Sequence, residues 1–147
     1  MKMIFGIITA IVSGAAMSLQ GVMNTRLSDK IGLMESNAFV QGTAFLLSLI
    51  AVFFFGKGSF QSITKTPPVY LFGGALGLVI TLTVMVAINH LNPTTAISII
   101  LISQLLVAAL IDAFGILGSE KIAFTPYKIL GVLLMIAGVI LIKYKTA

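Results

Sequence analysis

Long runs of apolar residues, separated by short polar connections, dominate the pattern along this chain. An α-helix needs about 20 mostly apolar residues to cross the hydrocarbon core of a bilayer. The connections hold most of the charges and three of the four prolines, and Asn92-Pro93 predicts a tight turn into the next helix. The pattern therefore predicts five spanning helices in one membrane domain, residues 1–147. They run at about Met3–Thr25, Met34–Phe55, Val69–Asn89, Thr94–Leu117 and Pro126–Ile142.

Composition strengthens this interpretation. The 147 residues are 59% hydrophobic and only 9% charged, whereas soluble domains carry about 25% charged residues. The apolar beginning of the chain also resembles a signal peptide, but we interpret it as the first spanning helix. Cysteine is absent, which excludes disulfides and Cys-based metal sites. We expect an all-α integral membrane protein with neither a metal nor a cofactor.

The distribution of positive charge bears on how the chain inserts. Five spans place five basic residues on the side of the N-terminus and four on the other side, a difference of only one. The first group is Lys2, Lys57, Lys65, Lys121 and Lys128, and the second is Arg26, Lys30, Lys143 and Lys145. Orientation normally follows an imbalance of Lys and Arg. The near balance favours insertion in both orientations; the alternative is that a few decisive residues fix one topology.

Asp112 is the candidate for chemistry within a span, because it lies in the apolar stretch LLVAALIDAFGILG. A carboxylate in such surroundings needs a partner, a proton or water. Its position is about 10 Å from the middle of the predicted helix and about 8 Å from the helix end. It is expected either to bind a proton or a cationic or hydrogen-bonding substrate, or to pair structurally with Lys121 or Lys128. Asp29 and Glu35, in contrast, are expected to be solvated loop charges.

Amide side chains form the second polar feature. Gln20, Asn24 and Gln41 lie toward one side of the membrane, and Gln104 lies near mid-depth. In an inverted second copy, Asp112 would reach about the depth of Gln20 and Gln41 of the first. We therefore expect a polar cavity, lined by these five residues, at the interface of an antiparallel homodimer. Alternatively, the amides hydrogen-bond between helices and stabilise packing by about 1 kcal/mol.

Small residues mark the faces on which membrane helices pack closely. The spacing predicts such contacts, within the chain or at a dimer interface, at Gly14, Gly21, Gly73, Gly77, Gly131 and Gly138.

Three segments resemble known transporters. The segment Gly118–Tyr144 resembles the closing segment of a drug/metabolite transporter repeat through Gly118, Glu120, Pro126, Gly131, Gly138, Val139 and Leu141, with Ser119 as a departure. Two further segments are similar to the YdcZ-type family of five-helix proteins. The first carries Gln20 and Asn24. The second carries Gln104, Leu105, Leu106, Ile111, Asp112, Phe114 and Gly115, with Ser103 where that family often has Gly.

The resemblance implies a small secondary exporter in the bacterial cytoplasmic (inner) membrane, coupled to a proton or substrate gradient. Larger members of the superfamily have ten helices in two inverted halves, so a five-helix chain is expected to pair with an inverted copy of itself. The expected partners are therefore lipid, a small-molecule substrate and a second copy, and not nucleic acid. An alternative is a non-transporting subunit or scaffold that needs a partner chain. One His, no Cys and no nucleotide-binding loop argue against an enzyme or an ATP motor.

Overall fold

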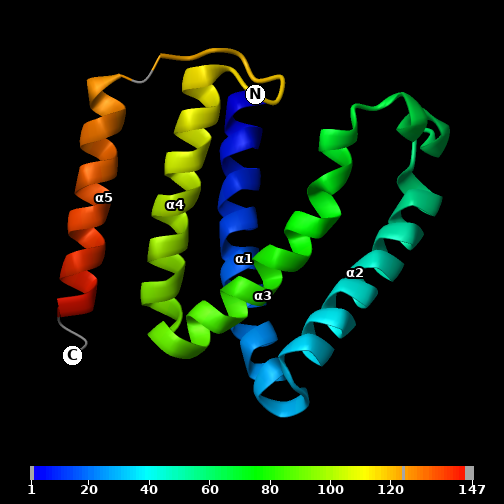
Figure 1. Ribbon diagram of the computed structural model, residues 1–147, viewed down its shortest axis with the longest axis horizontal. Coiled ribbons are helices and arrows are strands. Elements are labelled where there is room, and N and C mark those ends of the chain that lie inside the picture. Colours follow the sequence, from blue (N-terminus) through cyan, green and yellow to red (C-terminus); the bar gives the residue numbers. More distant parts are fainter. Residues whose placement is uncertain (1, 124, 145–147) are drawn as a thin grey trace. The chain divides into compact units, whose positions relative to one another are not determined.

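The computed structural model describes residues 2–123 and 125–144, with the side chains of Lys2 and Lys143 left out. Lys145, counted above among the charges, lies outside the described residues. The chain divides into two compact units, Met1–His90 and Leu91–Ala147, and each is considered by itself. Every regular element in the described residues is a helix (Figure 1).

The first unit begins with α1 (Lys2–Ile31) and α2 (Leu33–Phe55), which pack against each other. The segment RLSDKIG, expected as a loop, is helical up to Ile31 because no helix-breaking residue precedes Gly32. The chain reverses at Gly32, whose φ of 100° is a conformation that favours glycine. With 30 residues, α1 is about 45 Å long and exceeds the hydrocarbon thickness.

A connection with two short 3₁₀-helices, η1 (Phe60–Lys65) and η2 (Pro68–Phe72), leads from α2 to α3 (Gly73–Leu91). The third span was expected to begin at Val69, but Val69 lies in η2 and the α-helix begins four residues later. Pro67 and Pro68 begin this segment, and the Tyr70 N–H bonds to the Pro67 carbonyl three residues back, which is the 3₁₀ pattern.

The second unit is the helical pair α4 (Pro93–Phe114) and α5 (Pro126–Tyr144). The Asn92 side chain accepts a hydrogen bond from the Thr95 backbone N–H at 3.0 Å and caps α4. The expected end of this helix at Leu117 is wrong. The helix ends at Phe114 because Gly115 adopts the left-handed conformation, φ 62°, and its N–H bonds to the Ile111 carbonyl.

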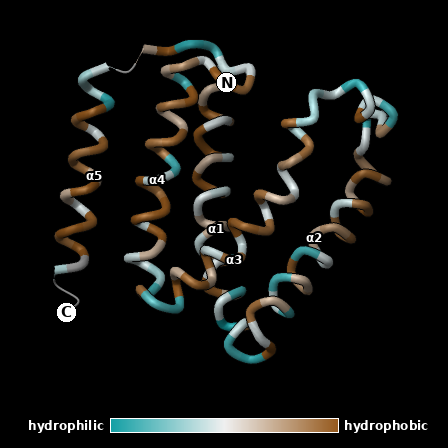
Figure 2. The backbone as a smooth tube through the Cα atoms, viewed as in Figure 1, coloured by the Kyte–Doolittle hydropathy of each residue, from teal (hydrophilic) through white to brown (hydrophobic). Residues whose placement is uncertain are grey.

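Within the described part of the chain, four helical segments are long and apolar enough to cross a membrane: Met3–Ile31, Leu33–Phe55, Pro68–Leu91 and Pro93–Phe114. The fifth, Pro126–Ile142, is apolar but shorter. Hydrophobic residues follow these helices along their length, and hydrophilic residues gather at the turns (Figure 2). The expected helical membrane architecture is thus confirmed for four spans plus one shorter apolar helix.

The predicted packing glycines differ in their surroundings. A Cβ built on Gly21 would lie 2.8 Å from Ile88 Cδ1 and 3.1 Å from Val84 Cγ1, so α1 and α3 approach closely there. Gly77 faces the Gln41 amide, 3.8 Å from its Nε2. Among the described residues, a Cβ on Gly14, Gly73, Gly131 or Gly138 would meet no other group within 4 Å. A packing role for these four remains a prediction.

Candidate functional site

Asp112 faces Lys128 across the α4–α5 pair. The Asp112 Oδ2 and Lys128 Nζ atoms are 3.6 Å apart, and the two side chains are 39% and 35% exposed. Because α4 ends at Phe114, Asp112 lies only about 3 Å from the helix end, and not the 8 Å expected from the sequence. The backbone N–H of Ile122 donates to the Asp112 carbonyl at 2.8 Å, which ties the following loop to this helix end.

A pocket of about 420 Å³ opens beside this ion pair. Apart from Asp112 and Lys128, its lining is apolar and comprises Leu105, Ala108, Ala109, Gly131, Val132 and Met135. Ala108 and Gly131 carry little side chain, and this leaves the space between the two helices unfilled. The volume is in the range of small-molecule sites, which are mostly apolar with a few placed polar groups.

Gln41 forms a polar contact in the first unit. Its Nε2 donates to Thr81 Oγ1 at 3.4 Å, and the Thr81 hydroxyl donates to the Gly77 carbonyl at 2.8 Å. Sequence reasoning missed Thr81. The available signal was its position four residues after Gly77, because residues at this spacing lie on the same face of a helix.

Asn24 lies in a buried polar cluster where α1 meets α2. Asn24 is 7% exposed, and its backbone carbonyl accepts a hydrogen bond from the fully buried Ser36 hydroxyl at 3.2 Å. The neighbouring Asn37 is also buried, and its Oδ1 has no hydrogen-bond partner among the described residues. Buried polar oxygens of this kind are commonly satisfied by a water molecule or an ion.

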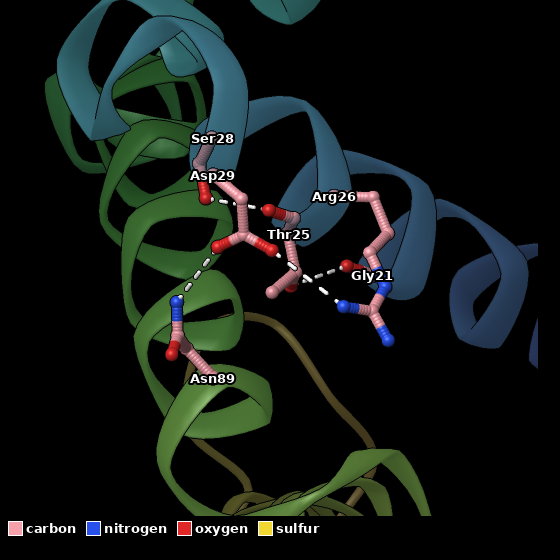
Figure 3. A network of polar contacts seen from close by, with 6 residues as sticks. All are labelled: Gly21, Thr25, Arg26, Ser28, Asp29 and Asn89. Atoms are coloured by element: carbon pink, nitrogen blue, oxygen red, sulfur yellow. Dashed lines mark hydrogen bonds and ion pairs between the residues drawn. The ribbon is translucent and has the colours of Figure 1, made fainter.

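Asp29 is part of a network between α1 and α3 (Figure 3). Asn89 Nδ2 donates to Asp29 Oδ1 at 3.0 Å, and Arg26 Nη1 lies 3.7 Å from Asp29 Oδ2. Neither Asp29 nor Glu35 is a loop charge: Asp29 lies in the last turn of α1, and Glu35 lies in the first turn of α2. Glu35 there complements the positive end of the helix dipole.

Gln20 and Gln104 are exposed on α1 and α4. No side-chain hydrogen bond joins either of them to another described residue. Gln104 also stays outside the pocket lining, although it precedes Leu105 directly. The five predicted site residues are therefore distributed between the units, with Gln20, Asn24 and Gln41 in the first and Gln104 and Asp112 in the second. Neither unit assembles them by itself.

Comparison with known proteins decides the family. The family described as "Putative inner membrane exporter, YdcZ" matches residues 5–141. The chain belongs to the YdcZ family. No curated protein and no solved structure was found to match it.

Membership confirms the resemblance seen in the sequence and makes the chain an integral inner membrane protein of a family described as exporters. It is accordingly a membrane transport protein in the broad sense. The YdcZ-like segment with Gln104, Asp112 and Gly115 covers the carboxyl-terminal half of α4 and the glycine that follows it. Its Phe114-Gly115 pair is the point at which this helix ends.

Proposed function

We propose that the protein is a secondary exporter of a small molecule, assembled from two chains of opposite orientation and driven by a proton or substrate gradient. The transport site is a polar cavity at their interface. Asp112, Gln104, Gln20, Asn24 and Gln41 line it, and Asp112 binds a proton or a cationic or hydrogen-bonding part of the substrate.

The exposure of Gln20 and Gln104 carries this proposal. Gln104 lies at the middle of α4, and Gln20 is about 5 Å from the middle of α1. An amide in hydrocarbon is costly unless its donors and acceptor are satisfied. Both side chains are exposed and neither has a side-chain partner among the described residues, which favours a further protein surface or a wet cavity at these positions.

Depth supports an inverted second copy. Asp112 lies about 13 Å from the middle of α4, and Asn24 lies about 11 Å from the middle of α1. Because successive spans are expected to alternate in direction, we expect these two residues toward opposite surfaces of the membrane. Inverting a second copy brings its Asp112 to about the depth of Asn24. Inverted repeats with a site between them are a common plan of secondary transporters.

The experiment maps two ends of the fold with single thiols. The chain has no Cys, so Ser62→Cys reports the α2–α3 connection and Lys145→Cys reports the C-terminus. An impermeant thiol reagent is applied to intact cells and again after permeabilisation. If the chain inserts in both orientations, as the near balance of positive charge favours, about half of each thiol is expected to react from outside.

The other outcomes overturn parts of the proposal. One thiol fully outside and the other fully inside means five spans in a single orientation, which excludes a self-inverted dimer. Both thiols on the same side mean that α5 does not span. In either case the alternative function, a subunit that needs a different partner chain, becomes the better account.

A further inference from the structure

The pocket between α4 and α5 has a specific chemistry at its polar end. It presents one carboxylate and one ammonium, from Asp112 and Lys128, above an apolar lining. Their separation of 3.6 Å exceeds that of a charge-assisted hydrogen bond, about 2.8 Å. Both side chains remain more than one-third exposed, and pairs of this kind separate at little cost.

We infer that this pocket binds amphipathic zwitterions, molecules that carry an ammonium and a carboxylate at one end and a compact apolar group at the other. This inference rests on the proposed function, because it names the substrate class of the Asp112 site. The ligand ammonium pairs with Asp112 and the ligand carboxylate pairs with Lys128. The apolar group lies against Ala108, Val132 and Met135.

Charge balance selects a zwitterion over a simple ion. In the empty pocket the two side chains neutralise each other. A cationic ligand that takes Asp112 leaves Lys128 without its partner, and an anionic ligand that takes Lys128 leaves Asp112 without its partner. Because both side chains are more than one-third exposed, an unpaired charge here costs a modest amount, and that cost weakens the binding of a singly charged ligand. A zwitterion replaces one ion pair by two and leaves no charge unpaired.

The helix dipoles favour the same ligand. Asp112 lies in the last turn of α4, and Lys128 lies in the first turn of α5. Each side chain therefore has the charge that the dipole at its helix end disfavours, because anions are stabilised at helix N-termini and cations at C-termini. The bound ammonium would lie at the C-terminus of α4 and the bound carboxylate at the N-terminus of α5. Both dipoles favour this orientation.

The test is a set of four ligands on the full-length protein purified in detergent. Leucine carries both charges and an apolar group. 3-Methylbutylamine is leucine without the carboxylate, 4-methylpentanoate is leucine without the ammonium, and alanine lacks most of the apolar group. Titration calorimetry is expected to show leucine binding at least about fivefold more tightly than either singly charged analogue. Leucine is also expected to bind more tightly than alanine, by about tenfold.

Two substitutions test which side chain binds the ammonium and which binds the carboxylate of the ligand. Asp112→Asn is expected to remove the advantage of leucine over 4-methylpentanoate, and Lys128→Met its advantage over 3-methylbutylamine. Lys121→Met, a loop lysine outside the pocket lining, is the matched control and is expected to leave all four affinities unchanged. Circular dichroism and the elution volume establish that each variant is folded. The comparison of the four ligands on the unmodified protein stands even if a variant does not fold.

Equal or tighter binding of 3-methylbutylamine overturns the inference in favour of a site for simple cations, and no binding of leucine overturns it entirely. Binding in detergent does not depend on membrane orientation. The zwitterion preference can therefore fail while both orientations are found, or hold while only one is found, so the failures of the two proposals are distinguishable.

Discussion

At the scale of single residues, Gly21 shows what close packing requires. The side chains of Ile88 and Val84 on α3 occupy the space that a Cβ on Gly21 would need, whereas a Cβ on Gly6 in the same helix would meet nothing within 4 Å. Glycine therefore permits the approach of α1 and α3, and the buried Ile88 lies at this contact.

We expect Gly21→Val to destabilise the protein by about 1–3 kcal/mol, because extra methyl groups in a filled contact force neighbouring side chains out of place. Gly6→Val makes the same change on an open surface of α1 and is expected to have a much smaller effect. Thermal unfolding in detergent, followed by circular dichroism, measures both. Equal losses would mean that the α1–α3 contact does not depend on Gly21.

The predicted site residues show the limit of reasoning from sequence at this scale. Asp112 was recognisable because an acid in an apolar stretch requires an explanation, and Lys128 was one of its two possible partners. The Gln41–Thr81 and Asp29–Asn89 contacts were not recognisable. Their members are 40 and 60 residues apart in sequence, and helical periodicity relates only near neighbours.

At the scale of elements, the carboxyl-terminal end of α4 depends on one residue. Gly115 has φ 62°, and a Cβ there would lie 3.2 Å from Lys121 Cβ. The turn that follows positions the loop whose Ile122 N–H bonds to the Asp112 carbonyl. The end of the helix and the position of the acid are thus linked.

Gly115→Ala is expected to cost about 1–2 kcal/mol, the usual penalty for a Cβ in the left-handed conformation. Gly115→Asn should restore part of this loss, since Asn tolerates that conformation better. Gly58→Ala, in the α2–α3 connection with open space around it, is the control and should change little. Chemical denaturation in detergent measures the three variants. An unchanged stability of Gly115→Ala would show that this cap does not hold the helix end.

The helices themselves were largely predictable, because their apolar length and their flanking prolines and glycines are local features of the sequence. The exceptions are all at ends. α1 continues six residues beyond its expected end at Thr25, and α4 ends three residues before its expected end at Leu117. In the first case polar residues remain helical because no helix-breaking residue precedes Gly32, and Arg26 and Asp29 form an exposed ion pair one turn apart. In the second case a left-handed glycine ends a helix within an apolar run.

At the scale of the whole molecule, large apolar side chains are exposed on each of the helices α1 to α5. Lipid tails can cover this apolar surface, but they cannot form hydrogen bonds with the side-chain amides of Gln20 and Gln104. The proposed dimer follows from these two amides more than from the apolar area.

Gln20→Leu combined with Gln104→Leu is therefore expected to weaken self-association. Interhelical hydrogen bonds contribute about 0.6 kcal/mol each on average, so the loss of two should raise the dimer dissociation constant by about eightfold. Energy transfer between labelled chains in liposomes measures this constant. Gln61→Leu, in the exposed η1 segment, is the matched control. Stronger association of the double variant would indicate that the amides line a wet cavity and do not bond across the interface.

The sequence by itself determined the membrane class, the approximate positions of the helices and the family. The length of the apolar runs, the small number of charged residues and the order of the motifs are all local properties of the sequence. The tertiary structure decided which polar groups have partners. It paired Asp112 with Lys128, Gln41 with Thr81 and Asp29 with Asn89, and it left Gln20 and Gln104 without a side-chain partner among the described residues. The physical reason is that the hydropathy of a segment depends only on its own residues. A hydrogen bond or an ion pair depends instead on the distance between two atoms, and packing of the helices sets that distance.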